Sequence, residues 1–364
     1  MYLAGVNIGG HFSQIEANTQ VIKDPFDNFI TEEDIRKIKE WGFNCVRFPV
    51  DYSFFTLEDG SFDEERMKKT DRIIDFCSDA GLYVIFDLHK APGHSFAFKE
   101  RDENDIWDKK SANRKKFIDI WDMLSKRYKN RDKILYEILN EPVAPEDNMW
   151  YELADEAIAA IRENDTEHFI VVESNLWGQS SRFVNMKKYD DEKILYSFHF
   201  YDPIVVTHQM AEWTSFYKYD IYRKKTFYPG RPEGLDDSVR AKVEKLDNHF
   251  ATWLDGQDKE WNIDELEKVM KPVLDFKNRH NVPVLCGEFG CVAHGDPQTR
   301  INWTRDFMAL CAKHGISFTY WNYKNLDFGI YDFTEKYADN PNYQNDERLD
   351  KGVLGELQNG ILHP

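Results

Sequence analysis

Two short motifs each place a glutamate at the end of an apolar run. Residues 134–142 read ILYEILNEP, and residues 282–290 read VPVLCGEFG. A strand that ends in polar residues and a proline can be purely structural. Two facing carboxyl groups can also cleave a glycosidic bond, because one protonates the leaving oxygen while the other attacks the sugar or activates water. The first candidates for such chemistry are therefore Glu141 and Glu288.

Eight apolar runs alternate with helical patterns along the chain. The predicted strands are Leu3–Ile8, Phe43–Phe48, Leu82–Leu88, Ile134–Leu139, His168–Val172, Ile194–Phe200, Val282–Cys286 and Ile316–Trp321. The segments WGFNCVRF, AGLYVIFD and HGISFTYW each show a helix end, a glycine and a buried strand. This pattern predicts an α/β fold, a (β/α)8 TIM barrel of parallel strands. A doubly wound open sheet is the alternative, but no G-x-G-x-x-G follows the first strand.

The predicted helices have clear start and stop signals. Thr31 and Asp34 form a capping-box pattern, and Gly42 marks the stop of that helix. Four further helices are expected at Asp71–Ala80, Arg114–Tyr128, Glu265–Phe276 and Arg300–Lys313.

More than the usual length of chain separates the sixth and seventh predicted strands. We interpret the excess, approximately residues 205–262, as a small subdomain inserted between strand six and its helix. No linker of Pro, Ser or Gly separates it, so residues 1–364 are interpreted as a single catalytic domain.

Polar residues stand at the carboxyl ends of nearly all predicted strands. These ends read Arg47, Asp87-Leu88-His89, Asn140-Glu141, Glu173-Ser-Asn-Leu-Trp177, His199-Phe-Tyr201, Gly287-Glu288 and Trp321-Asn322. In a barrel these ends meet at one rim, where active sites lie. Burying so many polar groups without a purpose would cost on the order of a few kcal/mol each. We therefore predict an active site that contains Glu141 and Glu288.

The combination of NEP, HFY, GEFG and WNYK in this order resembles glycoside hydrolase family 5, a family of clan A (β/α)8 enzymes. The resemblance extends from Ala4 to about Tyr331, and HKAPGHSF and HFYDP resemble a bacterial endoglucanase subgroup. The eight family positions correspond to Arg47, His89, Asn140, Glu141, His199, Tyr201, Glu288 and Trp321. One departure is His11 in NIGGHFSQ, where many relatives carry Trp.

The resemblance implies a retaining mechanism with Glu141 as acid/base and Glu288 as nucleophile. It implies that Arg47 keeps Glu288 ionised, that Tyr201 orients Glu288, and that His199 lies beside Glu141. Asn140 and His89 are expected to bind sugar hydroxyls, and Trp321 to form an apolar floor on which a sugar ring packs.

Three residues outside the family set are weaker candidates for substrate binding. His94 lies in HKAPGHSF, Trp177 in SNLWGQSS, and Trp213 in the expected insertion. Trp177 is either a stacking platform or a core residue. His89, His94 and His199 also permit a metal site, but the usual lysine or paired-Asp pattern is absent, so we expect no metal and no cofactor.

Charge and composition restrict the partners. The net charge of −18 repels nucleic acid and anionic lipid, but not a neutral polysaccharide. The five cysteines show no CxxC pair, and neither a signal peptide nor an 18-residue apolar window is present. We expect a cytoplasmic monomer without a membrane or nucleic-acid partner; a secreted protein whose leader was trimmed is the alternative.

The function expected from these residues is a retaining endo-β-glucanase, a cellulase that cleaves β-1,4 bonds in cellulose-type or mixed-linkage β-1,3/1,4-glucans or their oligosaccharides. A β-mannanase or glucomannanase and an exo-β-1,3-glucosidase share the mechanism and remain alternatives. A non-catalytic carbohydrate-binding barrel is the alternative of another class; it would be expected to lack one of the two carboxylates.

Overall fold

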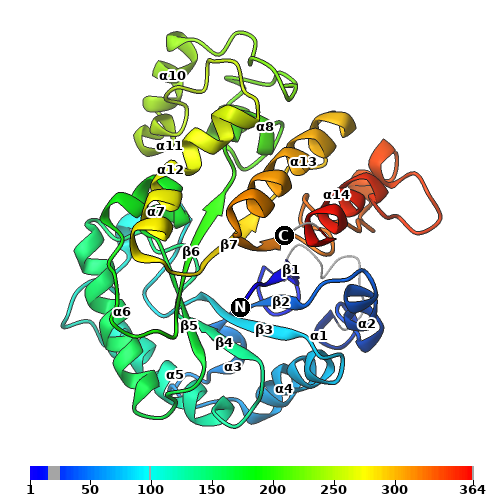
Figure 1. The fold of residues 1–364 in the computed structure, drawn as a ribbon. Helices are drawn as coiled ribbons and strands as arrows, with labels where there is room; N and C mark the ends of the chain where they lie inside the picture. Colours follow the sequence, from blue (N-terminus) through cyan, green and yellow to red (C-terminus); the bar gives the residue numbers. More distant parts are fainter. Residues whose placement is uncertain (15–24, 98–99, 363–364) are drawn as a thin grey trace. The chain divides into compact units, whose positions relative to one another are not determined.

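Eight parallel strands close a barrel in the order β1 to β8 in the computed structural model, which describes residues 1–14, 25–97 and 100–362. The strands are β1 (Ala4–Asn7), β2 (Cys45–Asp51), β3 (Tyr83–Lys90), β4 (Ile134–Glu137), β5 (Phe169–Glu173), β6 (Ile194–Phe200), β7 (Val284–Phe289) and β8 (Ser317–Tyr320). All eight overlap predicted strands, so the predicted barrel is confirmed. Figure 1 shows α4, α5 and α6 outside β2–β5.

The barrel closes through β1, which pairs with both β2 and β8. Gly5 lies opposite Cys45 on one side and Thr319 on the other. A Cβ atom on Gly5 would lie 2.2 Å from the carbonyl oxygen of Cys45. Glycine is therefore required for this close approach of two strands.

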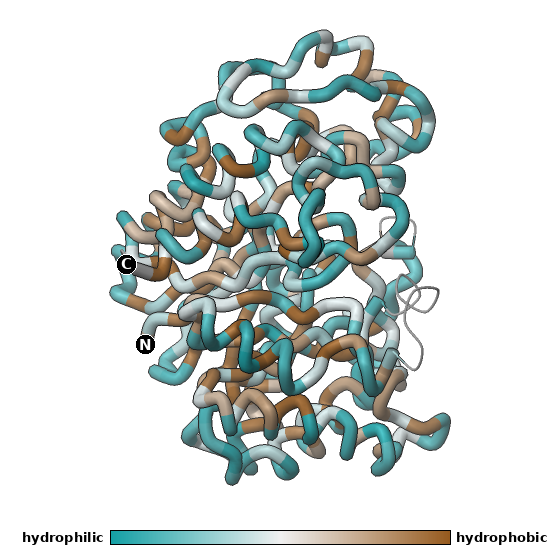
Figure 2. The backbone as a smooth tube through the Cα atoms, turned by 90° about the vertical axis from the view of Figure 1, so that its right-hand side faces the viewer, coloured by the Kyte–Doolittle hydropathy of each residue, from teal (hydrophilic) through white to brown (hydrophobic). Residues whose placement is uncertain are grey.

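A layer of apolar side chains fills the barrel. It consists of Leu3, Cys45, Ile85, Leu135, Val171, Leu195 and Leu285, all at most 1% exposed. Figure 2 shows that hydrophobic stretches recur along the chain, as expected for strands that are covered on both faces. Cys45 is a small apolar member of this layer, and all five cysteines lie in the described ranges, buried and outside any disulfide.

Helices connect the strands. They are α1 (Pro25–Asn28), α2 (Glu32–Glu40), α3 (Tyr52–Phe55), α4 (Glu64–Asp79), α5 (Ala112–Tyr128), α6 (Asp147–Arg162), α7 (Asn175–Gly178), α8 (Ile204–Thr207), α9 (Ser215–Lys218), α10 (Asp237–Glu244), α11 (Asn248–Thr252), α12 (Ile263–His280), α13 (Pro297–His314) and α14 (Lys351–Leu362). The predicted capping box is present, because Thr31 and Asp34 bond to each other's backbone N–H groups. Within the described ranges, no helix is both long and apolar enough to cross a bilayer.

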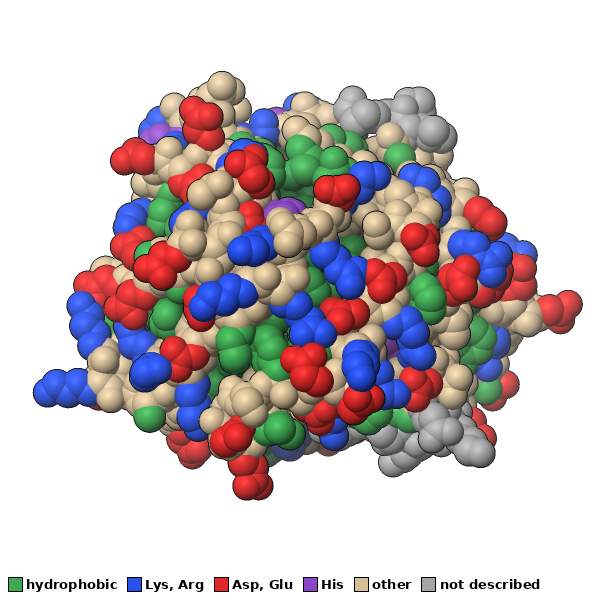
Figure 3. Space-filling view, turned by 90° about the horizontal axis from the view of Figure 1, so that it is seen from below, with side chains coloured by type: hydrophobic (Ala, Val, Ile, Leu, Met, Phe, Trp, Pro, Cys, Tyr) green, Lys and Arg blue, Asp and Glu red, His purple; other side chains and the backbone are tan. Residues whose placement is uncertain are grey.

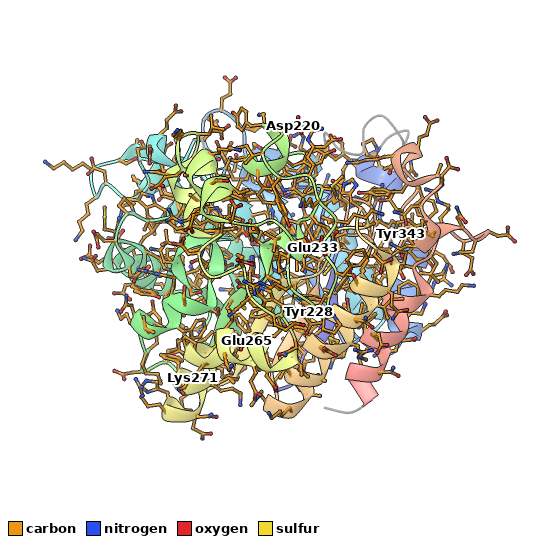
Figure 4. The ribbon with its side chains drawn as sticks, turned by 90° about the horizontal axis from the view of Figure 1, so that it is seen from above. Asp220, Tyr228, Glu233, Glu265, Lys271 and Tyr343 are labelled. Atoms are coloured by element: carbon orange, nitrogen blue, oxygen red, sulfur yellow. The ribbon has the colours of Figure 1, made fainter. Side chains whose placement is uncertain are left out.

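The chain divides into two compact units. The first comprises residues 1–199, 272–288 and 316–320, and the second residues 200–271, 289–315 and 321–364. In the second unit, the hydroxyl of Tyr228 donates to Asp306 on α13 at 3.0 Å, and Glu265 and Lys271 lie on α12 (Figure 4). The segment predicted as an insertion, 205–262, belongs to the second unit together with α13 and α14; its status as a subdomain stays a prediction.

Acidic and basic side chains are interspersed on the face drawn in Figure 3, with apolar side chains between them. Many charged side chains of the described residues form pairs along or between helices, such as Lys126 with Asp122 and Arg127 with Asp71. Exposed pairs of this kind contribute at most about 1 kcal/mol each.

Candidate active site

The first unit brings Glu141 and Glu288 together around His199. One carboxylate oxygen of each glutamate and one ring nitrogen of His199 all lie within 4.8 Å of one another. Nδ1 of His199 lies 3.1 Å from Oε1 of Glu141 and 3.6 Å from Oε2 of Glu288. The two residues singled out by the sequence therefore face each other from β7 and from the segment after β4.

The backbone at Glu141 turns sharply out of the strand. Regular pairing of β4 ends at Glu137, and Glu141 has a φ of 46°, in the left-handed region that residues other than glycine seldom adopt. Such strain persists only where the surroundings hold it, and it is common at functional sites. Here it presents the carboxyl group, whose side chain is 17% exposed.

Arg47 is the central cation of the site and is fully buried. Its Nη1 donates to Glu288 at 2.7 Å, and its Nε and Nη2 form a two-pronged pair with Glu137 at 2.7 and 3.1 Å. It also lies 3.0 Å from Asp87 and donates to the amide oxygen of Asn140 at 2.8 Å. Charge-assisted contacts of this geometry fix both the strand ends and the direction of the Glu288 carboxylate.

The two glutamates differ in their contact with positive charge. Burial raises the pKa of Glu141 to about 7, so its carboxyl group carries a proton through much of the neutral range. Burial also raises the pKa of Glu288, but Arg47 opposes this effect through a direct 2.7 Å pair. Arg47 lowers the pKa of both glutamates, but Glu288 is the member of the pair that it contacts directly.

Burial keeps the two site histidines neutral. It lowers the pKa of His89 to about 4 and that of His199 to about 3. Nδ1 of His89 lies 2.8 Å from Asp87, so this carboxyl group fixes the ring orientation.

Four further polar residues of the site were not assigned a role from the sequence. They are Asn7, Asp87, Glu137 and Glu173, all fully buried. Asn7 accepts from Arg47 at 2.9 Å, while its amide donates to the Gly287 carbonyl at 2.9 Å. The available signal was a carboxylate or amide within an otherwise apolar strand, as in Phe-Asp-Leu, Tyr-Glu-Ile and Val-Glu-Ser.

Tyr201 and Trp321 belong to the second unit. They pack in one cluster with Ala211, Val292 and Phe328. In the same unit His208 contacts the rings of Tyr201, Phe328 and Trp213 at centroid distances of 5.0, 5.4 and 6.3 Å. Trp213 is 51% exposed, so it presents an open ring face next to this cluster.

His94 and Trp177 are both more buried than their predicted roles in substrate binding suggested. The indole N–H of Trp177 donates to the carbonyl of Phe96 at 2.7 Å, and the side chain is only 5% exposed. This favours the core alternative that the sequence left open. His94 is 6% exposed and stands edge-on to Trp107. His11, the departure from the family pattern, is buried and stacks on Phe12 at 4.0 Å.

Two overlapping groups of side chains in the described ranges offer the nitrogen and oxygen ligands that a metal cation binds. One is Glu141, His199 and Glu288; the other is Glu137, Glu173 and His199. Both include His199, whose two nitrogens already face carboxylates on either side. The arrangement is equally suited to moving a proton between carboxyl groups, which is the chemistry that the glutamate pair requires.

Comparisons with known proteins agree with this geometry. Residues 7–327 match the family described as Cellulase (glycosyl hydrolase family 5). Endoglucanase C of Acetivibrio thermocellus is 34% identical over 338 residues, which cover 92% of this chain and 95% of that protein. Cellodextrinase A of Ruminococcus flavefaciens is 30% identical, with 86% and 83% covered.

Solved structures share the fold over nearly the whole chain. The cellulose synthase subunit Z of Clostridioides difficile superposes with a TM-score of 0.72 at 25% identity and covers 98% of this chain and 99% of its own. The chain belongs to the cellulase family, glycosyl hydrolase family 5, and is a glycoside hydrolase of the endoglucanase type.

Proposed function

We propose that this enzyme is a retaining endo-β-glucanase that hydrolyses β-1,4 bonds in cellulose-type or mixed-linkage β-glucans. The observation that carries the proposal is the placement of carboxylate oxygens of Glu141 and Glu288 within 4.8 Å of each other. Retaining enzymes hold their carboxyl groups about 5–5.5 Å apart, whereas inverting enzymes need about 6.5–9.5 Å to admit a water.

In the first step, the Glu288 carboxylate attacks the anomeric carbon, and the bond from this carbon to the leaving sugar oxygen breaks. Glu141 gives its proton to that oxygen. In the second step, Glu141 takes a proton from water, the water oxygen bonds to the anomeric carbon, and the ester bond to Glu288 breaks. The sum is hydrolysis with the original anomeric configuration.

Asn140 is proposed to bind the 2-hydroxyl of the sugar that reacts. Its oxygen is held by Arg47, and its Nδ2 is buried with no hydrogen-bond partner among the described residues. An amide donor fixed in this way is suited to a hydroxyl next to the reacting carbon, where contacts strengthen in the transition state. Tyr201 is proposed to orient Glu288, Trp321 to pack against a sugar face, and His89 to contact hydroxyls.

The substrate is tested by reducing-sugar release from carboxymethylcellulose, mixed-linkage β-glucan, galactomannan and β-1,3-glucan. Activity on the first two, with a rapid fall in viscosity, is the expected result. Glu141→Gln should lose about 100- to 10,000-fold, because general acid catalysis contributes this much. Glu146→Gln is the matched control, since Glu146 is exposed five residues further along the same segment. Release mainly from galactomannan would overturn the substrate but keep the mechanism.

The mechanism is tested separately by proton NMR of the first product formed. A retaining enzyme releases the β-anomer first, and initial release of the α-anomer would refute the double displacement. Glu288→Gly should be inactive on polymer but should use an α-configured glycosyl fluoride, which occupies the space that the nucleophile leaves.

A second candidate is action on short oligosaccharides. One relative at 30% identity is called a cellodextrinase. Activity confined to soluble cello-oligosaccharides, without a fall in polymer viscosity, would favour this candidate.

A further inference from the structure

Asp51, the last residue of β2, carries a carboxyl group that the proposed mechanism does not use. It stands directly before α3, where an aspartate usually accepts an N–H of the following helix, but its side chain makes no such bond. The side chain is 12% exposed, and its Oδ1 is buried with no hydrogen-bond partner among the described residues. Buried polar atoms are nearly always hydrogen-bonded in native proteins, so this oxygen is suited to a ligand.

An irregularity in β3 places Lys90 beside Asp51. Val50 pairs with Leu88 of β3. The next residue, Asp51, pairs with Lys90, so His89 is an extra residue in β3. Such a bulge redirects side chains and is common beside active sites. Here Nζ of Lys90 comes to 3.7 Å from Oδ2 of Asp51, and the Lys90 side chain remains 40% exposed.

The backbone of Asp51 is held from both sides. Its N–H donates to the carbonyl of Phe12 at 3.0 Å, and Phe12 also forms a parallel bridge with Val50. The ring of Phe12 is fully buried and stacks on that of Phe54 in α3, with the centroids 3.9 Å apart. A polar group on such a fixed support loses little conformational entropy when it binds a ligand.

Asp51 lies close to the groups that surround the reaction. Burial lowers the pKa of His89 to about 4, while the charges of Glu288 and Asp51 both oppose this effect. Burial likewise raises the pKa of Asp87 to about 7, and the charge of Asp51 adds to this rise. The pair of Asp51 and Lys90 therefore borders the histidine that is proposed to contact sugar hydroxyls.

We propose that Asp51 and Lys90 form a subsite that binds two neighbouring hydroxyl groups of one glucosyl unit of the substrate. A carboxylate only accepts hydrogen bonds and an ammonium group only donates them, whereas a hydroxyl does both. One hydroxyl therefore donates to Asp51 while its neighbour accepts from Lys90. The last torsion of an aspartate is broad, so a small rotation turns Oδ1 toward the sugar. This subsite rests on the proposed function, because it recognises a sugar of the chain that Glu141 and Glu288 cleave.

Loss of either partner should weaken substrate binding more than turnover. Asp51→Asn replaces a charged acceptor by a neutral one, so kcat/KM on an aryl cellobioside should fall about 10-fold. The change should lie mainly in KM, because the contact is made away from the reacting atoms. Lys90→Met should raise KM about 3- to 10-fold. Lys187→Met is the matched control, since Lys187 also pairs with an aspartate, Asp155 at 2.6 Å, but on α6. This control should leave KM unchanged.

Aryl cellobiosides that each lack one hydroxyl group test the contact itself. For the wild type, the analogue without the hydroxyl that Asp51 binds should be about 10-fold poorer than the parent compound. Asp51→Asn should lose nothing further on this analogue, but about 10-fold on the others. Equal losses on every analogue would mean that Asp51 acts through charge or packing alone, and this result would overturn the proposal. Lys90→Met provides the same comparison for the neighbouring hydroxyl, with a side chain on the surface whose loss spares the fold.

The same assays separate this inference from the proposed function. If the wild type did not cleave the aryl cellobioside, the proposed function would fail and the subsite with it. Cleavage that is abolished in Glu288→Gly but unchanged in both Asp51→Asn and Lys90→Met would refute only the subsite.

Discussion

Arg47→Met directly tests how much the buried ion pairs of Arg47 stabilise the protein and its active site. Arg47 pairs with Glu137 and Glu288 at 2.7 Å and with Asp87 at 3.0 Å, and its own side chain is fully buried. Removing one partner of a buried ion pair costs about 3–5 kcal/mol, because the remaining charge stays buried. With an unfolding entropy of about 2.1 cal/mol/K per residue, the whole chain of 364 residues gives about 0.76 kcal/mol/K. The expected fall in Tm is therefore about 4–7 °C.

The same substitution should change the acid side of the pH profile. Arg47 lowers the pKa of Glu288, which must be ionised to attack, so removing it should raise that pKa by about one to three units. The acid limb of kcat/KM should move to higher pH by this amount. An aryl cellobioside with a good leaving group is the suitable substrate, because its cleavage depends little on the acid Glu141.

Arg114→Met is the matched control. Arg114 is also buried and forms a two-pronged pair, with Glu156 at 3.0 Å for each contact, but between α5 and α6. Its loss should lower Tm without moving either limb. If Arg47→Met left the acid limb in place, the protonation of Glu288 would not depend on Arg47, and the assignment of the anion within the glutamate pair would fail.

The remaining predictions concern Glu141, Asn140 and Gly178. The wild-type alkaline limb of kcat/KM should lie near pH 7, because burial raises the pKa of Glu141 to about 7. This limb should be absent with the aryl cellobioside. A limb above pH 9 would contradict the assignment of Glu141 as the acid. Asn140→Ala should lower kcat/KM by about 10- to 100-fold, an effect of about 1.5–3 kcal/mol for a lost hydrogen bond in a charged site, with a smaller effect on a 2-deoxy substrate. Gly178→Ala should lower Tm, because φ is 65° there and the added Cβ would press on Glu173 and on the backbone N of His199; thermal unfolding of this variant measures the effect.

The strands were predictable because parallel strands buried on both faces read as continuous apolar runs. The residues at which the strands end were less predictable. β2 was expected to end at Phe48 but continues to Asp51, since Pro49 still pairs with β3 opposite Asp87. β4 was expected to reach Leu139, but regular pairing ends at Glu137, before the chain turns out toward the left-handed backbone of Glu141. Sequence periodicity contains no signal for such a turn.

The buried carboxyl groups of Asp87, Glu137 and Glu173 illustrate what a single sequence cannot show. Glu137 lies 90 residues from Arg47 along the chain, and their pairing follows only from the closure of the barrel. Trp177 was considered as a stacking platform because it lies in a loop with polar neighbours. In the structure the backbone at Leu176 and Trp177 is left-handed, and the indole N–H of Trp177 donates to the carbonyl of Phe96, about eighty residues away along the chain.

The different roles of Glu141 and Glu288 follow from the number of carboxyl groups around Arg47. The carboxyl groups of the site are Asp87, Glu137, Glu141, Glu173 and Glu288, and the histidines beside them are neutral. One guanidinium cannot balance them all in a medium of low polarity, so protons must remain on some. Burial raises the pKa of Glu173 well above its ordinary range, so Glu173 keeps its proton, and burial raises the pKa values of Asp87, Glu137 and Glu141 to about 7 each, so these three groups share the others. When Glu288 forms the ester, its negative charge is lost, and the pKa of Glu141 should therefore fall. Such a fall allows Glu141 to act as an acid in the first step and as a base in the second.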